Sequence, residues 1–460
     1  MLILFGVGEL AATYMELLDY LEIEFAFFTD NDKSKWGNCY CGRQIVPPAA
    51  LKNMDCYILI SCTYVEEITE QLKSLGIQER LIGLEELCAF RRLPSPAGLN
   101  GSANTDRFHQ TENIFFDIYT STKWAGTEIW AANLAKEFVQ RGKNVCIIAK
   151  ADMDRSADDL EEIIYRAAKS GVISEIIKKI EERLPCVFIS NFGRAGFFAS
   201  ILAKKKYPGQ VKIVAVIHGD EKSCFERHMQ HQNYIDAVFC VSQMIRDKIV
   251  QSYTFRGPVY FKIQSLKTDT AWTRKYENRE VIRIGYAARL VKWPKRADLL
   301  PQLIKYMEKM NIKYRLQIAG SGECERSIRA FINECGLQNR IELLGQLPKE
   351  KMNDFWKQQD IVISLSEYEG SSLALLEAMS YGCVPVVTRV SGVEEVIEND
   401  KNGYICEIGN IKGITEKIWS LGIDYDKWSK FSRRSRRIIE ECCNYDQYVR
   451  YWLDHVLMWE

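Results

Sequence analysis

Residues 360–387 read DIVISLSEYEGSSLALLEAMSYGCVPVV, and this stretch decides the fold class of the chain. An apolar run at 361–365 is followed by a polar loop, by a segment with helical spacing of apolar residues, and by a second apolar run at 385–388. Strand, loop, helix and strand in this order are typical of a βαβ unit, whose two strands lie parallel. The loop with its glycine therefore stands between the carboxyl end of a strand and the start of a helix.

Short apolar runs alternate with helical segments along nearly the whole chain, in three series. The expected strands of the first series are 2–5, 25–29, 57–61 and 81–83. Those of the second are 114–119, 145–149, 186–190, 212–217 and 237–241. Those of the third are 282–286, 315–319, 341–344, 361–365 and 385–388. This alternation predicts an α/β fold in which helices cover both faces of parallel sheets, here as three Rossmann-like units.

Two breaks divide the pattern. Residues 92–106, RLPSPAGLNGSANTD, lack apolar periodicity and are rich in residues typical of linkers, and a polar stretch at 267–280 forms a weaker break. We therefore expect five segments. They are a Rossmann-like nucleotide-binding-type domain at 1–92, a linker at 93–112, two larger α/β domains at 113–275 and 276–444, and a C-terminal helix at 445–460.

The composition narrows the class of protein. Of 460 residues, 47% are apolar and 27% charged, which excludes a disordered chain, a collagen and a coiled-coil rod. The 61 basic and 61 acidic side chains cancel, so the large one-sign field of a dedicated nucleic-acid binder is absent. Residues 1–100 hold fourteen acidic and eight basic side chains, 8 − 14 = −6, so the remainder carries +6 and is the better place for an anionic ligand.

Cysteines and hydropathy indicate where the protein resides. Fifteen cysteines in a chain of this length suit small buried side chains in a reducing compartment better than a disulfide framework. The start, MLILFGVGEL, lacks a basic region and is interrupted by Gly6 and Gly8, and no later apolar run reaches the length of a membrane span. We therefore expect a cytoplasmic protein.

The first candidate site lies at the N-terminus. Gly6, Gly8 and Ala11 fit the G-x-G-x-x-A form of the dinucleotide fingerprint between a strand and a helix. Asp30 ends the second strand, where a carboxylate that binds a ribose is expected. A glycine turn that packs a helix on the sheet, followed by a loop aspartate, would use the same residues. A bound dinucleotide or nucleotide and a purely structural turn are both compatible with this pattern.

A second candidate site follows the expected strand 114–119. Gly126 would let a ligand approach the backbone closely at the start of a helix. Thr127 could cap that helix, and capping alone would also explain the segment.

The opening stretch carries the third candidate site. Ser371 or Ser372 suits the N-cap of the following helix, and the N–H groups of 371–374 would favour an anion. Glu369 in the loop and Glu377 inside the helix could accept hydrogen bonds from sugar hydroxyls. A capped helix with one exposed glutamate is the alternative.

Other polar residues follow strands of the same series. Arg289 and Lys295 come after 282–286, where two cations would neutralise a diphosphate leaving group, although a solvated basic loop is the alternative. His218 follows 212–217 and is expected to be a site residue. His228 and His231 lie in a polar helical segment and are expected at the surface.

Residues 113–445 resemble glycosyltransferase family 4, the retaining enzymes of the GT-B fold. The matching motifs are GYAARLVKWPKR at 285–296, LQIAGSGE at 316–323, IELLG at 341–345, DIVISLSEYEG at 360–370, LLEAMSYGCVPVV at 375–387 and SGVEEVI at 391–397. The resemblance implies two facing Rossmann-like domains. The first, 113–275, would be the acceptor-side domain and the second, 276–444, the donor domain, with the helix at 445–460 crossing back to the first.

The resemblance also implies roles for individual residues. Arg289 and Lys295 would hold the diphosphate, Glu369 would contact hydroxyls of the transferred sugar, and His218 would lie near that sugar and the acceptor. Further donor-binding positions implied by the motifs are Gly126, Gly320, Gly345, Gly370, Ser371, Ser372, Leu373 and Glu377. No metal and no cofactor would be required, because side-chain cations and helix N-termini take their place.

The implied reaction transfers a sugar from a nucleotide-diphosphate sugar to an acceptor hydroxyl with retention at the anomeric carbon. A glycan or a lipid-linked sugar would be the acceptor, in cell-surface polysaccharide or glycoconjugate assembly, with contact to the inner membrane face as a further expectation. A non-catalytic GT-B partner subunit and a GT-B nucleotide-sugar epimerase are the alternatives. The N-terminal unit resembles nucleotide-binding domains fused to bacterial sugar-assembly enzymes.

Overall fold

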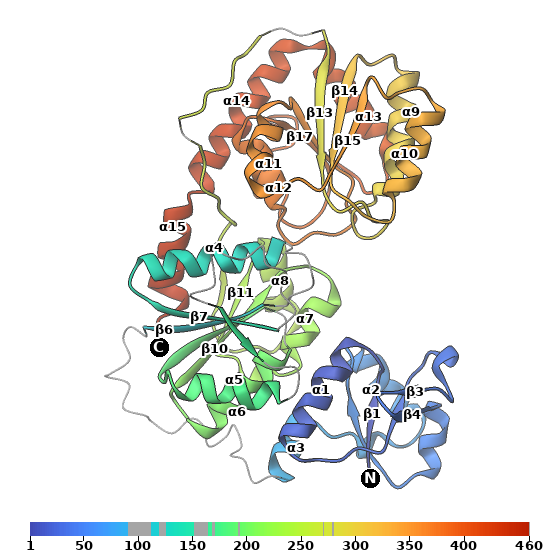
Figure 1. The fold of residues 1–460 in the computed structure, drawn as a ribbon, viewed down its shortest axis with the longest axis vertical. Helices are drawn as coiled ribbons and strands as arrows, with labels where there is room; N and C mark the ends of the chain where they lie inside the picture. Colours follow the sequence, from blue (N-terminus) through green and yellow to red (C-terminus); the bar gives the residue numbers. More distant parts are fainter. Residues whose placement is uncertain are drawn as a thin grey trace. The chain divides into compact units, whose positions relative to one another are not determined.

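The computed structural model describes residues 1–90, 112–118, 126–150, 164–167, 171–191, 194–269, 271–277 and 280–459 (Figure 1). These residues form an α/β protein with three separate sheets, which confirms the fold class expected from the alternating pattern. The linker expected at 93–112 lies outside the described residues except for residue 112.

The N-terminal sheet has five strands in the order β3-β4-β2-β1-β5. Its elements are β1 (Leu2–Phe5), α1 (Glu9–Tyr20), β2 (Phe27–Thr29), β3 (Cys39–Tyr40), β4 (Arg43–Val46), β5 (Tyr57–Ile60), α2 (Val65–Ser74) and α3 (Leu84–Phe90). Strands β2 and β5 flank β1 in parallel, and only the short β3 runs antiparallel to its neighbour. The strand expected at 81–83 was wrong, since that segment contributes a single bridge between Leu81 and Ile58.

The second sheet has seven strands in the order β12-β11-β10-β9-β6-β7-β8. Its strands are β6 (Asn113–Asp117), β7 (Asn144–Lys150), β8 (Ile164–Ala167), β9 (Cys186–Ser190), β10 (Val211–Ile217), β11 (Ala237–Cys240) and β12 (Val259–Phe261). Its helices are α4 (Gly126–Gln140), α5 (Val172–Glu181), α6 (Ala195–Lys206), α7 (Lys222–Met229) and α8 (Gln243–Ser252). Every residue of β9 and β10 is buried, as expected for central parallel strands covered on both faces.

The third sheet has six parallel strands in the order β15-β14-β13-β16-β17-β18. Its strands are β13 (Ile282–Ala287), β14 (Tyr314–Ala319), β15 (Ile341–Gly345), β16 (Ile361–Ser364), β17 (Val384–Thr388) and β18 (Tyr404–Cys406). Its helices are α9 (Leu300–Lys309), α10 (Glu325–Glu334), α11 (Lys349–Lys357), α12 (Leu373–Ser380), α13 (Ile411–Ile423), α14 (Tyr425–Cys442) and α15 (Tyr445–Tyr451). Strand β16 lies centrally, as the opening stretch of sequence implied.

Alternate residues of the third sheet's strands enter two apolar cores. Ile361 and Ile363 of β16 pack with α9, α10 and α13, whereas Val362 packs with α11 and α12 on the other face. This period of two follows from the pleat of a strand. It explains why the strands read as continuous apolar runs rather than as alternating ones.

The described chain divides into two compact units. Unit 1 contains Met1–Phe239, Ile249–Tyr260 and Trp452–Glu460, and unit 2 contains Cys240–Lys248 and Phe261–Tyr451. At the C-terminus, α15 continues into a π-helical turn, Trp452–Val456, that belongs to unit 1. There the ring of Trp452 lies 4.3 Å from that of Phe239.

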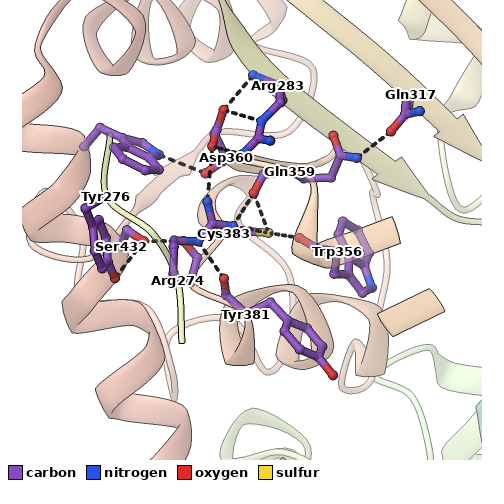
Figure 2. A network of polar contacts seen from close by, with 12 residues as sticks. Arg274, Tyr276, Arg283, Gln317, Trp356, Gln359, Asp360, Tyr381, Cys383 and Ser432 are labelled. Carbon is purple, nitrogen blue, oxygen red and sulfur yellow. Dashed lines mark hydrogen bonds and ion pairs between the residues drawn. The ribbon is translucent and has the colours of Figure 1, made fainter. Parts of the chain in front are cut away.

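A buried ion pair holds the amino ends of the third sheet's central strands together (Figure 2). Asp360 directly precedes β16 and is only 2% exposed. Its carboxylate pairs with Arg274 at 3.1 Å and with Arg283 of β13 at 2.8 Å, and its backbone oxygen accepts a bond from the Trp428 indole. This edge lies opposite the carboxyl ends, where a parallel sheet binds its ligands.

Candidate functional site

An ion pair joins two of the predicted site residues at the carboxyl edge of the third sheet. Strands β13 and β16 are parallel neighbours, so the loops that follow them meet at this edge. Lys295 Nζ, from the loop after β13, lies 2.5 Å from Glu369 Oε1 in the loop after β16. The two side chains are 19% and 11% exposed, so the pair is largely shielded but still open to a ligand.

Hydrogen bonds fix the loop that carries Glu369. Ser366 donates its hydroxyl to Glu369 Oε1 at 2.8 Å, and Thr388 of β17 donates to the Ser366 carbonyl at 2.5 Å. The Glu367 amide donates to the Pro294 carbonyl at 3.0 Å and so links this loop to the loop of Lys295. Glu369 therefore stands in a fixed position before any ligand arrives, which is how binding sites gain affinity.

The rims of the two loops also stack on each other. The rings of Trp293 and Tyr368 lie 5.9 Å apart at an interplanar angle of 16°. Arg296, which adopts a left-handed backbone with φ 49°, forms ion pairs with Glu367 and Asp298. These contacts join the sequence motif at 285–296 to the one at 360–370.

Helix α12 starts beside the ion pair, as predicted. Ser372 is its N-cap, and its hydroxyl accepts a bond from the Leu375 amide at 3.4 Å. Gly370 and Ser371 lead into the helix and pack against Gly392, where a Cβ atom would come within 2.8 Å of the Gly370 carbonyl oxygen. The first amides of a helix have no partner within it, so this end can accept an anion.

Glu377 lies half-buried within α12, just after the residues at the helix start. Burial raises the pKa of its carboxyl above the usual value. A carboxyl in such surroundings gains more from a hydroxyl partner than an exposed one does. Leu373, the first residue of the helix, is also only partly exposed.

Two predicted glycines join the loop of Arg289. The backbone of Ala288 bonds to that of Ala319 at 3.1 Å, and the Gly320 amide bonds to the Gly345 carbonyl at 2.7 Å, so the loops after β13, β14 and β15 continue the pairing of their strands. Gly320 has φ 135°, and a Cβ atom there would lie 1.9 Å from the Ala288 carbonyl oxygen. Only glycine allows this approach. Arg289 itself is exposed at the same edge.

Two predicted site residues lie in unit 1. Gly126 is the exposed first residue of α4. His218 follows β10, and its Nε2 lies 2.8 Å from the Asn191 side-chain oxygen while its ring meets that of Trp130 edge-on at 5.0 Å. Burial lowers the pKa of His218 to about 3, so its imidazole is neutral near pH 7.

The expectation that His228 and His231 lie at the surface was wrong. They are 1% and 9% exposed. His228 Nε2 lies 3.0 Å from the Ser190 hydroxyl, and His231 Nε2 lies 3.2 Å from the Tyr14 hydroxyl. Polar residues around them suggested an exposed helix, but the two rings pack against the aromatic ring of Phe197 on α6.

The N-terminal glycine motif lies where its pattern predicted. Gly6 is buried with φ 112°, Gly8 is the N-cap of α1, and Ala11 is fully buried under the first turn. Asp30 follows β2, and its Oδ2 accepts a bond from the Val7 amide at 2.9 Å. All four predicted residues therefore belong to one edge of the N-terminal sheet.

Ser366 was not among the predicted site residues, although the sequence carries a signal for it. Ser366 is a polar residue two places beyond the end of a buried strand, inside the opening stretch. Among the described residues, no group of three or more His, Cys, Asp or Glu side chains is arranged to hold a metal ion. Within the same part of the chain, no helix combines the length and apolar character that crossing a membrane requires.

The part of the chain that holds this site is similar to proteins that are already known. Residues 270–438 match the model for glycosyl transferases group 1, and residues 1–82 match the model named C2185-like, N-terminal. The fold is GT-B, as in the solved structures that it resembles. The match over 270–438 covers only part of the chain, and over this part, which holds the third sheet and its site, the sequence is similar to the group 1 glycosyl transferases.

Individual relatives are distant. The N-acetyl-alpha-D-glucosaminyl L-malate synthase of Bacillus anthracis is 25% identical over 295 residues, which span 60% of this chain and 75% of that protein. A variant of S. aureus TarM in complex with UDP and alpha-GlcNAc-glycerol superposes with a TM-score of 0.63 at 15% identity, covering 75% of this chain and 99% of TarM. Anabaena HepE in complex with UDP-glucose gives 0.62 at 17% identity, with coverages of 75% and 99%.

Proposed function

We propose that the protein is a retaining glycosyltransferase that moves a sugar from a nucleoside-diphosphate sugar to an acceptor hydroxyl, in the assembly of a polysaccharide or glycoconjugate. One observation carries this proposal. Lys295 and Glu369 form a shielded ion pair at the carboxyl edge of the third sheet, next to the start of α12. A diphosphate needs the cation and the helix amides, and a hexose needs the carboxylate.

When the donor binds, its diphosphate and sugar would replace the contact between Lys295 and Glu369. The diphosphate takes the ammonium group of Lys295, with Arg289 and the first amides of α12 adding charge and hydrogen bonds. Glu369, still held by Ser366, accepts hydrogen bonds from sugar hydroxyls. Glu377 accepts a bond from the ribose, and the loops of Gly320 and Gly345 border the nucleoside.

In the proposed reaction, the bond between the anomeric carbon and the phosphate oxygen breaks, and its electron pair stays on the diphosphate. The acceptor oxygen bonds to the same face of that carbon, and its proton passes to a phosphate oxygen. The cations stabilise the charge that develops on the leaving group. The neutral imidazole of His218, which the resemblance assigns to the transferred sugar, can donate or accept a hydrogen bond without adding charge.

Two observations on other proteins support this assignment. HepE was solved with UDP-glucose and TarM with UDP, so nucleotide sugars fit this fold. The name of the Bacillus anthracis relative and the alpha-GlcNAc-glycerol held by TarM both specify alpha linkages. Because UDP-glucose joins its sugar through an alpha bond, an alpha product is what retention gives.

Loss of either partner of the ion pair tests the site. We expect Lys295→Ala and Glu369→Ala each to lower sugar transfer at least tenfold, which corresponds to about 1.4 kcal/mol of barrier. The matched control is Lys292→Ala, which removes an exposed cation from the same loop and should leave turnover unchanged. Turnover is measured with a panel of nucleotide sugars, first as slow donor hydrolysis and then with hydroxyl acceptors.

The two parts of the proposal fail separately. Normal turnover of both Lys295→Ala and Glu369→Ala would remove the donor site from this edge. A product of inverted anomeric configuration, determined by NMR coupling constants, would contradict retention but leave the site assignment standing.

A further inference from the structure

A cavity of about 470 Å³ opens within unit 1, at the carboxyl ends of β1, β2 and β5. Its lining includes the glycine loop of Gly6 and Gly8, Lys35, and two arginines that follow in the chain far beyond the N-terminal sheet, Arg194 and Arg227. Its volume is that of a small-molecule site. We propose that this cavity is a second ligand site, in which a nucleoside diphosphate binds between the glycine loop and the two arginines.

The charge of the lining favours an anion. Three cations, Lys35, Arg194 and Arg227, face two carboxylates, Asp30 and Glu67. The carboxylate of Asp30 already has partners within the protein, because its Oδ2 accepts hydrogen bonds from the Val7 amide and from Lys35 Nζ, the latter at 3.0 Å. It therefore holds the glycine loop and the lysine in place, and a ligand meets a lining with net positive charge.

The two arginines come from helices of the second sheet. Arg194 is the N-cap residue of α6, and Arg227 lies in the last turn of α7. Both are half-buried. Burial raises the pKa of the Asp117 carboxyl to about 6, and the positive charge of Arg194 partly offsets this effect. A guanidinium group binds phosphate oxygens through paired hydrogen bonds, so two of them suit a diphosphate.

Contacts within unit 1 fix the arginines opposite the glycine loop. The ring of Tyr14 on α1 lies 5.1 Å from that of Phe198 on α6, and its hydroxyl meets His231. On α7, Lys222 Nζ pairs with Glu67 Oε1 of α2 at 2.8 Å. These contacts lie on both sides of the cavity, so its shape is formed before a ligand binds.

The opposite part of the lining suits a nucleoside. Leu10 and Ile68 give it an apolar wall, and the ring of Tyr64, which is 62% exposed, stands at the rim. An exposed aromatic ring beside an anion pocket can stack on a base. Phosphate-binding and base-binding surfaces within one cavity distinguish a nucleoside diphosphate from a simple inorganic anion.

This site goes beyond the proposed transfer reaction and is independent of it, because Lys295 and Glu369 belong to unit 2. It also goes beyond the N-terminal sequence pattern. Gly6, Gly8 and Asp30 could be found from that pattern, whereas no spacing rule connects them to Arg194 or Arg227.

A matched pair of substitutions at Gly8 tests the site in the full chain. Gly8 has φ 177°, an extended backbone open to any residue, and no atom lies within 4 Å of a Cβ placed there. Ser and Asp are both favourable N-cap residues, so Gly8→Ser and Gly8→Asp should fold equally well. Only the aspartate adds a negative charge where phosphate would bind.

Binding is measured by titration calorimetry with UDP, ADP and inorganic pyrophosphate, in a chain that also carries Lys295→Ala to weaken the donor site. We expect Gly8→Ser to retain nucleotide affinity and Gly8→Asp to lose it at least tenfold, with Arg227→Gln weakening it by a similar factor. Equal affinities of the two Gly8 variants, or an unchanged affinity of Arg227→Gln, would overturn the site. Pyrophosphate that binds as tightly as both nucleotides would overturn the nucleoside assignment.

The stoichiometry separates this proposal from the proposed function. With Lys295 present, two UDP sites per chain are expected, and Gly8→Asp should weaken one of them at least tenfold while Lys295→Ala weakens the other. A single site whose affinity is unchanged in Gly8→Asp and lower in Lys295→Ala would refute the cavity alone. A single site whose affinity is lower in Gly8→Asp and unchanged in Lys295→Ala would refute the donor site alone.

Discussion

Asp360 is the residue on which the amino edge of the third sheet depends. It is buried with Arg274 and also pairs with the half-buried Arg283. Asp360→Asn would leave the guanidinium of Arg274 buried without a counter-charge. Because such a loss costs about 3–5 kcal/mol, we expect a large drop in the free energy of unfolding, measured by urea titration with tryptophan fluorescence.

Arg283→Gln is the matched control for that substitution. The side chain of Arg283 is 30% exposed, and Asp360 would still keep Arg274, so a loss of about 1 kcal/mol or less is expected. If both variants lost the same free energy of unfolding, the pair with Arg274 would contribute no more to stability than the pair with Arg283. Because this network lies at the edge away from the donor site, the folded fraction of either variant should transfer sugar at the normal rate.

Single residues were harder to predict than the fold. Patterns in the sequence assigned Lys295 and Glu369 to two different loops, but no spacing rule states that their charged groups meet at 2.5 Å. The prediction that His228 is exposed was wrong, because its neighbours in the sequence are polar although its ring is buried against a separate helix. Burial of a polar side chain depends on tertiary partners, and local sequence does not contain them.

At the scale of elements, the close approach of three loops shapes the nucleoside side of the proposed donor site. Gly320→Ala would combine a left-handed backbone with a Cβ atom 1.9 Å from the Ala288 carbonyl oxygen, so the loops after β13 and β14 would have to separate. We expect a loss of about 3 kcal/mol or more in the free energy of unfolding, together with weaker UDP binding.

The control for this element is Gly336→Ala, at the end of α10. Gly336 also has a positive φ, 65°, but no atom lies within 4 Å of a Cβ placed there. Only the backbone cost of about 1–2 kcal/mol applies, and UDP binding should not change. If the two alanine variants lost equal stability, the close approach of the loops would not be what requires glycine at 320.

Long, periodic elements were predicted well and short ones were not. Strands such as β10 and β16 could be predicted because both of their faces are buried, so most of their residues are apolar. Strand β3 forms the edge of the N-terminal sheet and β4 lies next to it, and of their six residues only Ile45 is buried. Such short strands bury little apolar surface, and their sequence therefore resembles that of a loop.

At the scale of the whole molecule, the net charge is zero, with 61 basic and 61 acidic residues. General charge repulsion is therefore small near neutral pH, and a few buried groups should decide how stability changes there. In unit 1, burial lowers the pKa of His218 and His228 to about 3 and that of His231 to about 4, from an ordinary value of 6.5. All three stay neutral in the folded chain while the unfolded chain takes up protons below pH 6.5.

The sign of the effect follows from this difference. Since only the unfolded chain gains protons between pH 6.5 and the lowered pKa values, the free energy of unfolding falls as the pH falls through that window. Each histidine contributes about 1 kcal/mol between pH 7.5 and 5.5. The raised pKa of Asp117, about 6, acts in the opposite direction, because the folded chain binds that proton first.

One substitution isolates a single histidine from this sum. His231→Gln removes a titrating group but keeps a side chain that can bond to the Tyr14 hydroxyl. Urea titrations at pH 7.5 and 5.5 should show that the unsubstituted chain loses about 1 kcal/mol more than the variant does. Asp117 is present in both chains and cancels from the comparison. If both chains lost the same amount, His231 would have to be protonated in the folded state, and its burial would not exclude charge as the packing against Phe197 and Phe198 implies.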